Sequence, residues 1–194
     1  MKTNSSRFTI SRMLRWMLLS AAFFLLVLFL FRLAFHWYFK PTGISGTGRA
    51  FWLGFRYDAR VVGLFLLLAW LPAVFGLFRH FEKPAVRRTL LIWSRFFGLL
   101  IIIVYTFDFA HYAYLHERLN ASVLSYADDA AISANMVWQS YPVIKILLGW
   151  AILFLLIFFV TRYIYRIAAR GAAQTPTRWN RILTYFVFLL VIGV

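Results

Sequence analysis

The sequence predicts an all-α, polytopic membrane protein in which a bundle of helices crosses the bilayer. Hydrophobic residues make up 63% of the 194 residues and charged residues only 14%, whereas soluble domains carry about 25% charged residues. In lipid, every backbone polar group must be bonded internally, so apolar runs that span the membrane are either helices or strands of a closed barrel. The runs are too long for barrel strands and do not alternate as such strands do, and we therefore expect helices.

Five apolar runs predict five transmembrane helices in one membrane domain, residues 1–194. They cover about residues 14–38, 61–78, 90–109, 143–164 and 182–194. A basic tail precedes the first run, as in a secretory signal. This run is longer than a signal-peptide core and lacks a small-residue cleavage site, so we expect an uncleaved signal-anchor helix.

The fifth run is short for a crossing. Its 13 residues cover about 20 Å as a helix, against a hydrocarbon core of about 30 Å. We therefore expect a truncated last helix and interpret the chain as the N-terminal membrane part of a longer protein. The domain that would carry out chemistry is expected after Val194 and is absent from this chain.

The distribution of charge predicts the orientation. Three segments are strongly basic, namely the N-terminal tail, residues 79–95 and residues 162–181, and this places them on the cytoplasmic side. The acidic connection 108–142 belongs outside. The connection 36–60 is an exception, because it is basic although the parity of the crossings places it outside. The prediction is a multi-pass membrane protein with its N-terminus in the cytoplasm and its C-terminus outside.

The net charge of +15 identifies the expected partner. Because the Lys and Arg residues cluster beside apolar runs, we interpret them as topology signals that contact anionic phospholipid. Nucleic-acid binding is disfavoured for the same reason. A homo-oligomer remains an open alternative.

The outer connection is long enough to contain short helices. Between residues 116 and 142, apolar side chains recur at helical spacing, which predicts one or two short helices lying on the outer surface. Aromatic residues gather at the predicted outer helix ends and indicate an interfacial belt: Trp37, Tyr38, Trp52, Tyr112, Tyr114, Trp138 and Tyr141.

Motifs for chemistry are weak. The glycine-rich segment 43–48 lacks the Gly-Lys-Ser/Thr ending of a phosphate loop, and we interpret it as an outer loop. His111, His116 and Glu117 do not have the spacing of a zinc motif and are interpreted as solvated interfacial groups. The chain has no cysteine, which excludes thiolate chemistry.

Three charged residues form the candidate site. Asp108 lies near the outer end of an otherwise apolar helix, where a carboxylate is costly unless it has a partner. Arg56 and Arg60 are predicted at similar depth, so we expect an ion pair between Asp108 and one of them. Alternatively, Asp108 reaches outer water, and the two arginines either bind a lipid headgroup or anchor the end of their helix.

Two segments resemble the lipoteichoic-acid-synthase-like family of bacterial phosphoglycerol transferases. Gly54-Phe55-Arg56-Tyr57-Asp58 is similar to the family's G-[LF]-R-[FY]-D signature. The outer connection, with its segments 116–122, Asp128-Asp129 and 136–142, is similar to the corresponding connection in the family. The resemblance also covers the layout of five crossings.

The resemblance implies a membrane anchor for a catalytic domain, located in the bacterial cytoplasmic (inner) membrane. Family members carry an extracytoplasmic sulfatase-like domain in which a threonine beside a divalent metal, of the Mn or Zn type, transfers a phosphoglycerol-type group from a lipid. Neither that threonine nor the metal ligands belong to this chain, so no catalytic residue, metal site or cofactor is assigned to it.

The leading interpretation is therefore the membrane-anchoring domain of a phosphoglycerol or phosphoethanolamine-type transferase of the cell envelope. The first alternative is a small, non-enzymatic membrane protein that acts as a scaffold or subunit. A transporter is less favoured, because no internal repeat is seen and the helix cores are almost entirely apolar.

Overall fold

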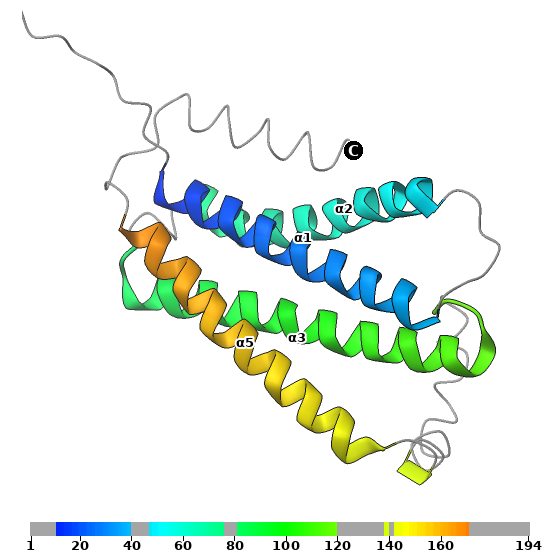
Figure 1. The fold of residues 1–194 in the computed structure, drawn as a ribbon. Helices are drawn as coiled ribbons and strands as arrows, with labels where there is room; N and C mark the ends of the chain where they lie inside the picture. Colours follow the sequence, from blue (N-terminus) through cyan, green and yellow to red (C-terminus); the bar gives the residue numbers. More distant parts are fainter. Residues whose placement is uncertain (1–10, 40–46, 76–80, 120–137, 140–141, 171–194) are drawn as a thin grey trace, which may run out of the picture. The chain divides into compact units, whose positions relative to one another are not determined.

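The computed structural model describes residues 11–39, 47–75, 81–119, 138–139 and 142–170, and the regular structure in these ranges is helical. The described residues form four long helices (Figure 1), namely α1 (Arg12–Phe39), α2 (Thr47–Val74), α3 (Pro84–Leu115) and α5 (Val143–Ala169). Three of them, α1, α3 and α5, are long and apolar enough to cross a membrane. The prediction of an all-helical chain is thus confirmed for the described residues, and three helices have the length and composition of membrane spans.

The predicted count of five crossings is not confirmed. The three membrane-spanning candidates correspond to the first, third and fourth predicted runs. The fifth run, 182–194, and most of the outer connection with its predicted short helices lie outside the described residues.

Helix α2 corrects the predicted start of the second run. We expected an apolar segment over 61–78, but the helix already begins at Thr47, so Thr47 and Gly48 belong to its first turn rather than to a loop. The charged residues between Arg49 and Arg60 concealed this extension, because apolar runs were the signal used. The structure shows that one face of this charged half packs on α1.

The chain divides into two compact units, and α3 and α5 contribute to both. The first unit contains Met1–Ser94 and Val160–Val194, and the second contains Arg95–Phe159. In the first unit, α1 and α2 lie side by side and run in opposite directions (Figure 1). Phe24 of α1 packs edge-on against Phe65 of α2 with ring centroids 5.2 Å apart.

The aromatic core of the first unit continues from α2 to the start of α3. The ring of Phe65 stacks on Trp93 at 6.0 Å, and the indole Nε1 of Trp93 donates a hydrogen bond to the Phe65 carbonyl at 3.1 Å. In an apolar environment an indole N–H needs such an acceptor. The contact therefore fixes both the packing and the rotation of α3 against α2.

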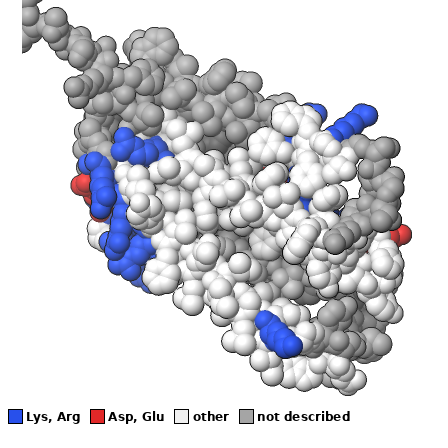
Figure 2. All heavy atoms as spheres, in the orientation of Figure 1, with Lys and Arg blue, Asp and Glu red and all other residues white. Residues whose placement is uncertain are grey.

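The basic end of the first unit is held by a second aromatic contact. Tyr165 of α5 stacks on Phe81 at 4.9 Å, and its hydroxyl donates to the Phe81 carbonyl at 2.7 Å. Arg12 of α1 forms an ion pair at 2.6 Å with Glu82, the residue that follows Phe81. Figure 2 shows Lys and Arg side chains gathered where α1 begins and α5 ends. These are the ends that the charge pattern predicts on the cytoplasmic side.

In the second unit, α3 and α5 are joined by a polar contact and a close approach. Nε1 of Trp150 donates to Oγ1 of Thr106 at 2.9 Å, and this hydroxyl donates to the Ile102 carbonyl at 2.8 Å. A Cβ at Gly98 would meet the side chain of Ile157 at 2.7 Å, so glycine allows the two helices to approach closely. Small residues and interhelical hydrogen bonds are typical of helix contacts in membranes.

Candidate functional site

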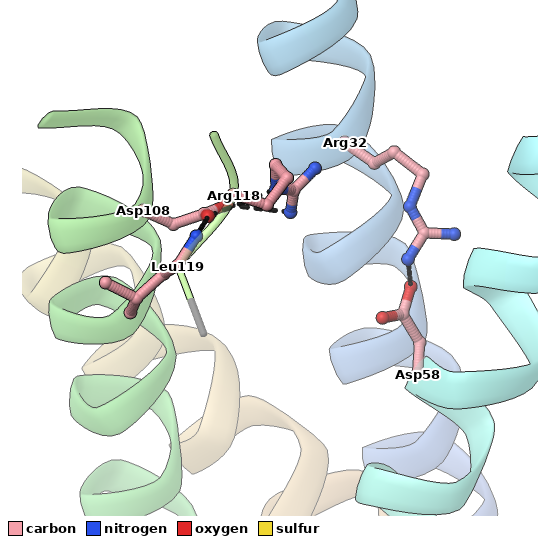
Figure 3. Close-up of polar contacts among 5 residues, drawn as sticks. All are labelled: Arg32, Asp58, Asp108, Arg118 and Leu119. Carbon is pink, nitrogen blue, oxygen red and sulfur yellow. Dashed lines mark hydrogen bonds and ion pairs between the residues drawn. The ribbon is translucent and has the colours of Figure 1, made fainter. Parts of the chain in front are cut away.

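The candidate site of the first unit is a salt bridge between α1 and α2. Nη2 of Arg32 lies 2.7 Å from Oδ2 of Asp58, and Nη1 of the same guanidinium donates to the Phe51 carbonyl at 3.1 Å. Figure 3 shows Arg32 reaching from α1 to Asp58 on α2. The side chains are only 17% and 12% exposed. Because each charge compensates the other, the pair can lie largely buried between α1 and α2.

A glycine makes this salt bridge possible. Gly54 lies between Phe51 and Asp58 on the same face of α2, and a Cβ built there would overlap the guanidinium of Arg32. A side chain at this position would therefore require the Arg32 guanidinium to shift from the place where it reaches its two acceptors. Two residues of the Gly54–Asp58 segment thus have a structural task, because both accommodate Arg32.

Sequence reasoning did not identify Arg32. Its partner lies on another helix, so the pattern within the first apolar run gave no reason to select it. One signal was available, because Arg32 and Asp58 are both costly in an apolar environment and are predicted near the same membrane surface. Opposite charges at similar depth in neighbouring runs could have suggested the pair.

The candidate site of the second unit is built around Asp108, which is 5% exposed. Its Oδ2 lies 2.7 Å from Nη2 of Arg118, and its Oδ1 accepts hydrogen bonds from Nε of Arg118 at 3.1 Å and from the Leu119 amide at 3.0 Å. Figure 3 shows Arg118 and Leu119 converging on the carboxylate. A carboxylate with this number of donors is well compensated.

The end of α3 explains this geometry. His116 adopts a left-handed conformation with φ of 58°, and its amide donates to the Tyr112 carbonyl at 2.9 Å. This is the common helix ending in which one left-handed residue reverses the chain. The reversal carries Arg118 and Leu119 back along the helix to Asp108. The candidate residue Asp108 therefore closes the end of its own helix.

The two arginines predicted as partners of Asp108, Arg56 and Arg60, are found in other contacts. We expected Arg56 or Arg60, but the ion pair of Asp108 is formed with Arg118, which the helix reversal places close by. Arg60 is exposed, and its guanidinium lies over the ring of Tyr57 at 5.5 Å. Arg56 is half-buried. A role of these two arginines at a lipid headgroup stays a prediction.

Several side chains of the predicted aromatic belt are exposed. Tyr114 is 78% exposed, Trp37 77% and Trp138 64%, as expected for rings at headgroup depth. Tyr141 lies outside the described residues. Among the residues that the structure describes, no group of three or more His, Cys, Asp or Glu side chains could hold a metal ion.

Comparisons with family models, with curated proteins and with solved structures find no match for this chain. The function is therefore argued from the residues and from the resemblance described above.

Proposed function

We propose that this chain is the membrane-anchoring N-terminal domain of a bacterial cell-envelope transferase. The transferred group is of the phosphoglycerol or phosphoethanolamine type, and the catalytic domain is sulfatase-like and extracytoplasmic. The proposal rests on the similarity of the segment 54–58 to the family signature. It places the chain in the inner membrane, with the N-terminus in the cytoplasm.

One structural observation supports this proposal most directly. The segment with the resemblance forms a fixed helical junction, in which Gly54 and Asp58 of α2 hold Arg32 of α1. An anchor must hold its helices in a fixed arrangement, and a compensated ion pair between two helices does this. Arg56 lies away from this junction, on another face of the helix.

The proposal is tested on the full-length gene product. We expect the reading frame to continue after codon 194 into an α/β domain with an Asp/His-rich metal site and a candidate threonine. In proteoliposomes containing radiolabelled phosphatidylglycerol or phosphatidylethanolamine, the full-length protein should transfer the headgroup phosphate moiety. A chelator should abolish transfer, and Mn²⁺ or Zn²⁺ should restore it.

Residues 1–194 expressed alone provide the matched control, because they should insert into the membrane and show no transfer. A stop codon directly after Val194, or a following domain without a metal site, would contradict the proposal. The non-enzymatic scaffold or subunit would then be the better interpretation.

A further inference from the structure

We propose that one exposed face of α2 binds an anionic phospholipid, with the phosphodiester headgroup on its arginines and the acyl chains along its leucines. We call this surface the α2 lipid face and define it by residues 49, 52, 53, 56, 57, 60, 64, 68 and 71. The proposal does not depend on the transferase function, since it requires only that the first half of α2 lies at a membrane surface.

The arginines of the α2 lipid face share one side of the helix. Arg49, Arg56 and Arg60 are separated by seven and four residues, which at 3.6 residues per turn places them in one narrow sector. Arg49 and Arg60 are exposed and Arg56 is half-buried. A guanidinium binds a phosphate through two parallel hydrogen bonds, so this row of cations is suited to a phosphodiester.

Aromatic side chains flank the arginines. Trp52 is 59% exposed and Tyr57 is 57% exposed. The Arg60 guanidinium lies over the Tyr57 ring, which orients the cation without neutralising it. Rings of this kind prefer the boundary between headgroups and acyl chains, so they mark this depth on the surface.

The same face becomes apolar deeper along the helix. Leu64, Leu68 and Leu71 continue the sector of the arginines towards the C-terminal end of α2, and they are 56%, 45% and 41% exposed. The face is therefore cationic at one end and apolar beyond it, in the order of a phospholipid headgroup and its chains. A soluble anion would need only the cationic end.

The opposite side of α2 fixes the direction of this face. Gly54 and Asp58 lie on that side and are held by Arg32, so rotation of α2 would break the salt bridge. The arginine row is consequently directed away from α1. Its positive charge also lies in a connection that parity places outside, where topology does not require basic residues, and lipid binding provides a reason for it.

The test measures lipid binding to the purified chain in detergent by native mass spectrometry. We expect phosphatidylglycerol to bind more tightly than phosphatidylethanolamine or phosphatidylcholine. The double variant Arg49→Gln/Arg60→Gln should weaken the tightest phosphatidylglycerol site about 25-fold, since each cation near the lipid contributes about fivefold. Binding of phosphatidylcholine should not change.

A matched control removes two exposed cations elsewhere. Arg88→Gln/Lys145→Gln lowers the net charge by the same amount, and both residues are exposed outside the α2 lipid face. This variant should retain the tightest phosphatidylglycerol site. The variant Arg49→Lys/Arg60→Lys keeps the positive charges but loses the bidentate geometry, so its affinity for phosphatidylglycerol should lie between those of the unmodified chain and the glutamine variant. Thermal unfolding of all variants separates loss of binding from misfolding.

Four results would overturn the proposal. The first is an equal loss of phosphatidylglycerol binding in the control variant, and the second is no preference for the anionic lipid in the unmodified chain. The third is displacement of bound lipid by free glycerol phosphate at comparable concentration, which would identify a soluble anion as the ligand. The fourth is a change of oligomeric mass in the Arg49→Gln/Arg60→Gln variant, which would identify the face as a protein interface.

Discussion

At the scale of single residues, Gly54 shows how a missing side chain can determine a contact between helices. The Arg32 guanidinium occupies the space that a Cβ at Gly54 would fill, and it is bonded there to a carbonyl and a carboxylate. The ion pair therefore depends on three positions on two helices. A change at any one of them should weaken the contact between Arg32 and Asp58.

The first prediction concerns Gly54→Ala. The methyl group should shift the Arg32 guanidinium and weaken its bonds to Asp58 and to the Phe51 carbonyl, which lowers the free energy of unfolding by about 1 kcal/mol. Thermal unfolding in detergent, followed by circular dichroism, measures the effect. The control is Gly48→Ala in the same helix, where no atom lies within 4 Å of the new Cβ. Equal stability of the two variants would show that the missing side chain at Gly54 is not needed for the contact with Arg32.

The second prediction concerns Asp108 and Arg118. In a double-mutant cycle with Asp108→Asn and Arg118→Gln, we expect a coupling energy of about 0.5–3 kcal/mol, as for residues in direct contact. The measurement is the midpoint of thermal unfolding of the four proteins. Parallel cycles of Asp108 with Arg56 or Arg60 test the partner that the sequence suggested. A coupling only in those cycles would exclude Arg118 as the main partner.

At the scale of the helices, hydropathy predicted the positions of three long apolar helices. The structure places α1 at Arg12–Phe39 and α5 at Val143–Ala169, close to the predicted 14–38 and 143–164. Lipid forces long apolar segments into helices, so composition is sufficient there. The start of α2 could not be predicted in this way, because its charged first half is stabilised by contact with another helix.

The partners of the charged residues were also beyond sequence reasoning. Asp108 was identified as a residue that needs a counter-charge, and it has one. The partner was predicted on a different helix. The residues around His116 do not indicate the left-handed turn that places Arg118 beside Asp108. Polar residues in apolar runs can thus be selected from sequence, whereas their partners depend on chain reversals and helix packing.

The third prediction concerns the contact between α3 and α5. Thr106→Val and Trp150→Phe each remove the hydrogen bond between the two side chains. Interhelical hydrogen bonds in membrane proteins contribute about 0.6 kcal/mol on average, and we expect a loss of this order in each variant. Chemical denaturation in mixed micelles measures it. The double variant should lose little more than either single variant, and fully additive losses would contradict a shared bond.

At the scale of the whole molecule, the charge distribution predicts which connections face the cytoplasm. The chain contains no cysteine, so single cysteines can report the side of each connection. Gly48 and Glu117 belong to connections predicted outside, and Lys83 to one predicted inside. All three side-chain positions are exposed in the structure.

The fourth prediction concerns this orientation. In intact bacterial cells, Gly48→Cys and Glu117→Cys should react with a membrane-impermeant maleimide, whereas Lys83→Cys should react only after permeabilisation. Gel shifts with a polyethylene-glycol maleimide measure the reaction. Equal labelling of Lys83→Cys and Gly48→Cys in intact cells would refute α2 as a crossing helix and the parity argument built on it.

The two carboxylate pairs also differ in the time at which synthesis makes their partners available. Asp108 finds Arg118 ten residues later, whereas Arg32 must wait for Asp58, 26 residues later. At about 5–20 residues per second, the ribosome needs about 1–5 s for that longer interval. During this time Arg32 carries an uncompensated charge near the membrane surface. We therefore expect α1 and α2 to leave the insertion machinery together as a helical hairpin. Helix α3 can insert as soon as its own end, with Arg118, has been translated.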